Sequence, residues 1–129
     1  MKMLGSSNIV AFVGTRQPAQ AREFYENMLG LHFVADEPFA LVFDANGITL
    51  RVAKVNELAP AGYTVLGWNV ADIAATVTEL RQKGVTFQRY EGLEQDDLGI
   101  WTSPGGARIA WLSDPDGNIL SLGEYTVGK

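Results

Sequence analysis

The alternation of hydrophobic and polar positions in the first half of the chain predicts one strand, one helix and three further strands. Residues 8–13 (Asn-Ile-Val-Ala-Phe-Val) are typical of a strand. A helix is predicted over residues 18–29, because Pro18 is a favoured first helical residue and Gly30 a favoured stop. Its apolar face comprises Ala21, Phe24, Tyr25 and Met28. The strands that follow cover residues 31–34, 39–44 and 48–55.

The same order of elements recurs in the second half, after a short linker. A strand is predicted over residues 65–70, and a helix over residues 73–83 with Asp72 as its N-cap and Gly84 as its stop. An acidic, loop-like segment covers residues 91–98. The other strands of this half are predicted at residues 85–90, 99–103 with 107–112, and 118–125. Each half is therefore a βαβββ module, and the chain contains an internal repeat.

A related hairpin closes each half. Residues 109–122 place the turn Asp114-Pro115-Asp116-Gly117 between two apolar runs, and the proline and glycine supply the φ angles that a turn needs. Residues 41–52 form a weaker copy with an Asn-Gly turn. We therefore expect an α+β fold of two modules, about 8–55 and 63–126, within a single domain over residues 1–129.

Composition narrows the class of protein. The formal net charge of -5 disfavours nucleic acid as a partner, because the phosphate backbone would repel the chain. No run of 18 apolar residues and no signal-peptide pattern is present, so we expect no membrane association and a cytoplasmic location. The absence of cysteine excludes disulfides, thiolate metal sites and a cysteine nucleophile.

Two separated motifs resemble those of a known family. The segment Phe24-Tyr25-Glu26-Asn27-Met28-Leu29-Gly30-Leu31 and the segment Asp114-Pro115-Asp116-Gly117-Asn118 are similar to the signatures of the vicinal oxygen chelate superfamily. This superfamily includes glyoxalase I, extradiol dioxygenases, fosfomycin-modifying enzymes and bleomycin-resistance proteins. The resemblance implies two βαβββ modules whose mixed sheets curl into a cupped half-barrel with the helices outside. It also implies a homodimer.

The family's enzymes hold a divalent metal at four strand positions, two in each module. In this sequence the resemblance places those positions at Asn8, Arg51, Val65 and Ser121. Asparagine and serine offer only weak neutral oxygens, valine offers no donor, and arginine repels a dication. Divalent ions at such sites favour carboxylate or imidazole donors. We therefore expect a member of the family that has lost the metal and uses no cofactor.

The cup wall that the resemblance implies is mostly apolar, with a few polar groups, which is typical of a small-molecule pocket. Period-two alternation along the strands supplies its members. The predicted ligand-binding residues are Asn8, Phe12, Arg51, Gly67, Asn69, Trp101, Trp111 and Ser121. Arg51 either binds an anionic or carbonyl-bearing ligand or forms an ion pair with Glu124 or Asp44. Trp101 and Trp111 either stack on a flat ligand or pack in the core, whereas Trp68 faces the helices.

The only histidine and the acidic segment each allow more than one interpretation. His32, the only histidine, is expected to be exposed on an edge strand, away from the metal positions, and a role as general base is poorly placed there. Glu94, Asp96 and Asp97 are expected in a solvated or mobile loop, with a lid or a cation site as alternatives.

Three functions follow from this sequence. The first is a metal-independent small-molecule binding protein of the bleomycin-resistance type. The second is an enzyme of the same fold, a lyase, isomerase or dioxygenase, for which Glu124 and Asp44 are the only acid–base candidates. The third is a structural or regulatory domain that binds no ligand. Substitution Arg51→Ala is expected to lower ligand affinity with little change in stability if the first is right.

Overall fold

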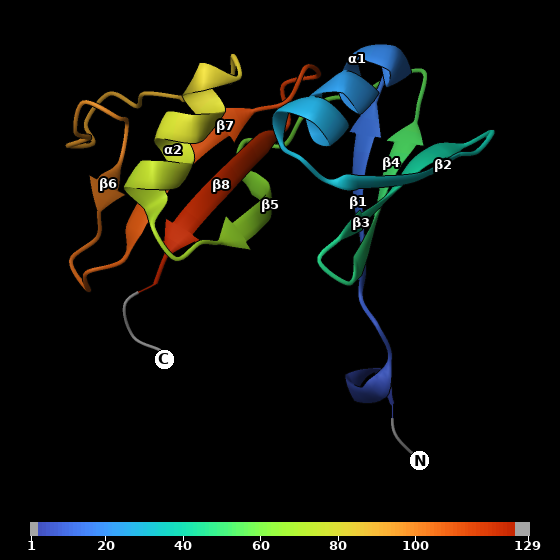
Figure 1. The fold of residues 1–129 in the computed structure, drawn as a ribbon, viewed down its shortest axis with the longest axis horizontal. Helices are drawn as coiled ribbons and strands as arrows, with labels where there is room; N and C mark the ends of the chain where they lie inside the picture. The colour runs from blue at the N-terminus through green and yellow to red at the C-terminus, as the bar shows by residue number, and fades with distance from the viewer. Residues whose placement is uncertain (1–2, 126–129) are drawn as a thin grey trace. The chain divides into compact units, whose positions relative to one another are not determined.

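The computed structural model describes residues 3–125 and consists of two compact units, Met1–Ala59 and Pro60–Lys129. Each unit contains a four-stranded mixed sheet with a helix against one face (Figure 1). The α+β class expected from the sequence is therefore confirmed. The predicted end of the second module, residue 126, lies outside the described residues. None of the helices described is both long and apolar enough to span a membrane.

The first unit follows the predicted order, with small shifts at the element ends. Its elements are η1 (Leu4–Ser6), β1 (Val10–Thr15), α1 (Pro18–Arg22), η2 (Glu23–Met28), β2 (His32–Asp36), β3 (Ala40–Ala45) and β4 (Ile48–Lys54). The sheet order is β1-β4-β3-β2, with β1 parallel to β4 and the other pairs antiparallel. The first strand begins two residues later than predicted, and the predicted helix changes from α-helical to π-helical geometry along its length.

The core of the first unit lies between this helix and the sheet. Ala21, Phe24 and Tyr25 are buried, as the helical periodicity predicted, and the rings of Tyr25 and Phe43 lie 5.9 Å apart. Leu50 and Val52 of β4 are also buried, and they alternate with half-buried residues that face the opposite side of the sheet. Burial of such apolar side chains supplies most of the stabilisation of a fold of this size.

The second unit repeats this topology with one difference. Its elements are β5 (Thr64–Asn69), α2 (Ile73–Gln82), β6 (Trp101–Thr102), β7 (Arg108–Ser113) and β8 (Ile119–Glu124). The sheet order is β5-β8-β7-β6, again with one parallel pair, β5 and β8. The side chains of Ile73 and Val77 on α2 are fully buried, as are those of Leu112 and Leu120 on the sheet.

The prediction of a strand over residues 85–90 is wrong. Their backbone makes a single bridge to β7, between Phe87 and Leu112, and a hydrogen bond from the Gln88 amide to the Trp111 carbonyl at 2.7 Å. The Gln88 side chain also donates to the Ser113 hydroxyl at 2.8 Å. The predicted strand over residues 99–103 shortens to β6. Between these two pairings the chain leaves the sheet edge as a loop over residues 89–100, so one edge strand is split into two short contacts.

Side-chain hydrogen bonds hold this loop closed. The Gln95 side chain accepts from the Tyr90 amide at 2.7 Å and donates to the carbonyls of Gln88 and Gly99 at 3.0 and 2.8 Å. The Asp96 carboxylate accepts from the amides of Leu98 and Ile100, both at 2.9 Å. The side chains of Gln95 and Asp96 therefore satisfy several backbone groups that a neighbouring strand would otherwise pair with.

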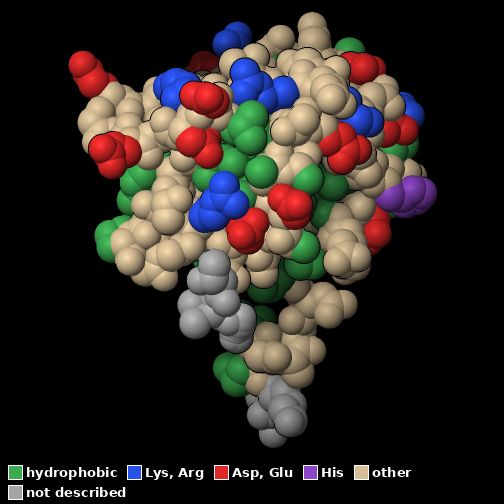
Figure 2. Space-filling model, turned by 60° about the vertical axis from the view of Figure 1, so that its left-hand side comes forward, with side chains coloured by type: hydrophobic (Ala, Val, Ile, Leu, Met, Phe, Trp, Pro, Cys, Tyr) green, Lys and Arg blue, Asp and Glu red, His purple; other side chains and the backbone are tan. Residues whose placement is uncertain are grey.

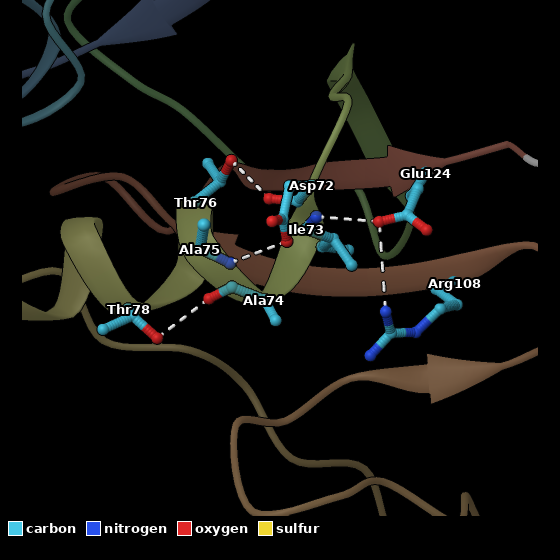
Figure 3. A network of polar contacts seen from close by, with 8 residues as sticks. All are labelled: Asp72, Ile73, Ala74, Ala75, Thr76, Thr78, Arg108 and Glu124. Carbon is cyan, nitrogen blue, oxygen red and sulfur yellow. Dashed lines mark hydrogen bonds and ion pairs between the residues drawn. The ribbon is translucent and has the colours of Figure 1, made fainter.

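The N-terminus of α2 is tied to the sheet (Figure 3). Asp72 caps the helix by accepting from the Ala75 amide at 3.1 Å, as the sequence predicted. Glu124 at the end of β8 accepts a second helix-end hydrogen bond, from the Ile73 amide at 2.9 Å, and lies 3.9 Å from the guanidinium of Arg108. A carboxylate at a helix N-terminus also interacts favourably with the helix dipole.

The turn between β7 and β8 is organised by Asp114. This residue is 5% exposed, and one of its carboxylate oxygens accepts from the amides of Asp116 and Asn118, both at 2.9 Å. The other oxygen accepts from the Asn118 side-chain amide at 2.8 Å. The motif that predicted the hairpin therefore forms it through this aspartate as well as through its proline and glycine.

Candidate functional site

The sheet of the second unit has one face against α2 and an opposite face built from the alternate residues. Strand register aligns Gly67 of β5, Ser121 of β8 and Trp111 of β7 in one row of that opposite face. The adjacent row comprises Asn69, Gly123, Ile109 and Trp101. Five of the predicted ligand-binding residues therefore share one face of one sheet: Gly67, Asn69, Trp101, Trp111 and Ser121.

Three aromatic rings gather on this face, and we call Tyr90, Trp101 and Trp111 the aromatic face. The ring centroids of Trp101 and Trp111 lie 6.1 Å apart at 36°, and Tyr90 meets Trp111 edge-on at 5.4 Å. All three side chains are half-buried. The tryptophans thus pack against each other on the side of the sheet away from α2, whereas Trp68 shares the helix side with Leu122. Tyr90 was missed because the sequence placed it at the end of a strand that does not form.

Tyr125 is a further aromatic residue that the sequence reasoning missed. Its ring lies over Gly123, so close that a Cβ on Gly123 would meet ring atoms at 2.5 Å. A glycine inside a strand often marks such a close approach, and Gly123 two residues before Tyr125 was the available signal. Tyr125 is 52% exposed.

The sheet face that bears these rings carries no charged side chain in the described strands. The alternating residues on it are apolar, aromatic, serine or asparagine, and Arg108 and Glu124 belong to the helix side of the sheet. On the surface in view in Figure 2, acidic and basic side chains are interspersed. The face can therefore offer stacking and neutral hydrogen-bonding groups, and it offers no charge.

In the first unit, register places Phe12, Arg51 and Val42 in one row on the face away from the helix. Phe12 is 61% exposed. Arg51 forms an ion pair with Glu37 at 3.1 Å, in place of the predicted partners Glu124 and Asp44. The Asp44 carboxylate instead accepts from the Gly47 amide at 3.2 Å, within its own hairpin turn.

The remaining predicted residues of this unit lie at its periphery. Asn8 precedes β1 and is exposed. His32 is exposed at the start of the edge strand β2, opposite Asp44, as the sequence predicted for an edge-strand histidine.

The four positions that bind metal in the family do not fit a divalent ion here. The Arg51 guanidinium carries a permanent positive charge, and Val65 has no donor atom. The Ser121 hydroxyl leans over Gly67, 2.9 Å from the point where a Cβ would stand. Within residues 3–125 no group of three or more His, Cys, Asp or Glu side chains is arranged to hold a metal.

In the described part of the chain, the acidic loop brings together no group of three or more His, Cys, Asp or Glu side chains that could hold a metal. The Asp96 carboxylate oxygen that points into the loop accepts two backbone amides, and the Arg89 side chain donates to the Asp96 carbonyl at 2.6 Å. Glu94, Asp96 and Asp97 are exposed in this loop, as the sequence predicted, and Asp96 in addition accepts hydrogen bonds from the loop backbone. Because Tyr90 and Trp101 lie at its two ends, the loop determines where two rings of the aromatic face are held.

Comparisons with known proteins agree with this architecture. The model of the Glyoxalase/Bleomycin resistance protein/Dioxygenase superfamily matches residues 8–122. A comparison with curated proteins found no match.

Several solved structures share the fold. A member of the glyoxalase/bleomycin resistance protein/dioxygenase superfamily from Sphaerobacter thermophilus is 26% identical, with a TM-score of 0.69 over 91% of this chain and 97% of that one. TnmS3, an antibiotic binding protein from a Streptomyces species, is 22% identical, with a TM-score of 0.69 over 94% and 98%. A lactoylglutathione lyase from Agrobacterium tumefaciens is 16% identical, with a TM-score of 0.70 over 92% and 93%.

Proposed function

We propose that this chain, which belongs to the Glyoxalase/Bleomycin resistance protein/Dioxygenase superfamily, is a metal-independent small-molecule binding protein. The planar part of the ligand stacks on the aromatic face of the second unit, and no bond of the ligand is broken. The observation that carries this proposal is the packing of Tyr90, Trp101 and Trp111 on an uncharged sheet face. Aromatic side chains of this kind bury large areas of a ligand at low entropic cost.

The polar groups beside the rings support a binding role. Asn69 and Ser121 lie on the same face, and a few polar groups within an apolar surface are typical of ligand sites. TnmS3, one of the solved structures with this fold, is described as an antibiotic binding protein, which supports a binding role.

The enzymatic alternative finds less support among the described residues. Glu124 and Asp44, its acid–base candidates, both accept hydrogen bonds from backbone amides. Glu124 does so at the N-terminus of α2, on the side of the sheet away from the aromatic face (Figure 3). The Glu124 carboxylate therefore does not lie beside the rings that the proposal assigns to the ligand.

Binding of acridone, a neutral, planar and fluorescent molecule, tests the proposal. We expect Trp111→Ala to raise the Kd for acridone by about 10-fold or more, because aromatic stacking is worth about 1–3 kcal/mol. Fluorescence anisotropy of acridone measures the Kd without relying on protein tryptophan. Trp68→Phe, on the helix side of the same sheet, is the matched control and should leave the Kd unchanged. Equal affinity of the Trp111→Ala variant and the wild type would refute the stacking site.

A further inference from the structure

The contact between Tyr125 and Gly123 lies on the same face of the second sheet as Trp101 and Trp111. Gly123 has the same parity as Ser121 in β8, so a Cβ on Gly123 would point to the same face as Ser121, and the ring of Tyr125, the first residue after the strand, lies where that Cβ would stand. The Tyr125 ring turns back along the strand, and its Cε2, Cζ and Oη atoms lie 2.5, 2.5 and 2.6 Å from the position of a Cβ on Gly123. The ring thus occupies the space that any other side chain at position 123 would take.

Backbone conformation does not explain the glycine. The φ angle of Gly123 lies outside the left-handed region, so an L-residue fits its backbone without strain. Glycine within a strand is also intrinsically less favourable than other residues. Glycine at position 123 leaves open the space in which the Tyr125 ring rests.

The ring rests at one end of the aromatic face. Gly123 pairs with Asn69 on β5 and with Ile109 on β7, and Ile109 in turn pairs with Trp101. Trp111 lies two residues beyond Ile109 on β7, which is about 7 Å from Ile109 at the spacing of strand residues. A planar molecule stacked on Trp111 would therefore have its edge near the Tyr125 ring.

Tyr125 also presents groups that a ligand can use. Half of its surface is exposed, although its ring is large and apolar. No residue among 3–125 forms a hydrogen bond with its hydroxyl. A tyrosine that combines an exposed ring with an available hydroxyl is typical of binding surfaces.

We propose that Tyr125, seated on Gly123, is a ligand-contacting residue that determines specificity at the end of the aromatic face. This inference rests on the proposed binding function and deepens it. The ring meets the edge of the planar ligand, and the hydroxyl hydrogen-bonds to a polar atom on that edge. The ligand class is therefore a planar aromatic molecule with a hydrogen-bonding group, such as a ring carbonyl, at its edge.

Two substitutions perturb the ring by different routes. Tyr125→Ala removes it, and Gly123→Ala leaves it in the chain but displaces it, because the new Cβ takes its place. Tyr125→Phe keeps the ring and removes only the hydroxyl. Gly105→Ala is the matched control, since a Cβ at Gly105 meets nothing within 4 Å.

The position of the ring is measured without any ligand. In the wild type the α-protons of Gly123 should show NMR chemical shifts displaced by the aromatic ring current. The displacement should vanish in Tyr125→Ala and persist in Gly105→Ala. Unchanged Gly123 shifts in Tyr125→Ala would overturn the seating and with it the inference.

Acridone, which has a ring carbonyl, is the binding probe. We expect its Kd to rise about fivefold or more in both Tyr125→Ala and Gly123→Ala, to rise less in Tyr125→Phe, and to stay unchanged in Gly105→Ala. Should Gly123→Ala fail to fold by circular dichroism, Tyr125→Ala decides alone.

The outcomes separate this inference from the function on which it rests. Acridone affinity that falls in Trp111→Ala but is unchanged or higher in Tyr125→Ala would overturn the role of Tyr125 alone. Failure of the wild type to bind acridone would overturn both.

Discussion

Arg51 lies on the face of the first sheet that bears no helix, and it is held there by an ion pair with Glu37. The two side chains are 31% and 47% exposed. Ion pairs with this degree of exposure contribute little to stability, because water screens the charges and two long side chains must be ordered. The ion pair therefore positions Arg51 but adds little to the free energy of unfolding.

Substitution Arg51→Ala should change the free energy of unfolding by less than about 1 kcal/mol. Urea denaturation of the wild type and of this variant measures the difference. Glu37→Gln, which removes the other member of the pair, should give a similarly small change. A loss of more than about 2 kcal/mol in either variant would show that the pair is structural. The expected loss of ligand affinity in Arg51→Ala stays a prediction.

Parity along a strand predicted the face on which Arg51 lies, but not its partner. Glu37 belongs to the turn between β2 and β3, and only the folded turn brings its carboxylate to β4. The sequence analysis named Glu124 and Asp44 as candidate partners, and the structure uses Glu124 at the N-terminus of α2 instead. Side-chain partners across a sheet depend on turn geometry and register, which a single sequence defines poorly.

At the scale of elements, the loop over residues 89–100 distinguishes the second unit from the first. Where the first unit has the continuous edge strand β2, the second has a bridge at Phe87, the loop, and then the two-residue β6. Gln95 joins the two ends of the loop through three hydrogen bonds. The positions of Tyr90 and Trp101 depend on that closure.

Substitution Gln95→Ala should lower the free energy of unfolding by about 1–3 kcal/mol, because it leaves part-buried backbone groups without their partners. Chemical denaturation measures this loss, and hydrogen exchange at the Tyr90 amide should accelerate. Gln82→Ala, at the exposed end of α2, is the control and should stay within about 0.5 kcal/mol of the wild type. An unchanged exchange rate at Tyr90 would mean that Gln95 does not close the loop.

The elements that the sequence predicted well share a local signal. The helix α2 has an N-cap and an apolar periodicity, and the hairpin at Asp114 has its own turn chemistry. The predicted strand over residues 85–90 had only β-favouring composition. A β-favouring composition shows that residues suit a sheet, but it does not show that a neighbouring strand is available for pairing. Tertiary context therefore decided that residues 85–90 do not form a strand.

For the whole molecule, the donor chemistry at the four family metal positions makes a prediction about metal content. After incubation with manganese, iron, nickel or zinc and desalting, we expect elemental analysis to find no retained ion. Asparagine, serine, valine and arginine do not form a site for a divalent cation. Retention of about one ion per chain would contradict this expectation and would favour the enzymatic function.

By itself, the sequence determined the repeated βαβββ order, the α+β class and the family, because periodicity, helix ends and turn motifs are local properties of the chain. It also identified the residues at the family's metal positions. Only the tertiary structure decided that Arg51 pairs with Glu37, that the loop over residues 89–100 replaces an edge strand, and that the Tyr125 ring rests on Gly123. Each of these depends on contacts between residues that strand register and turn geometry bring together, and those contacts exist only once the chain has folded.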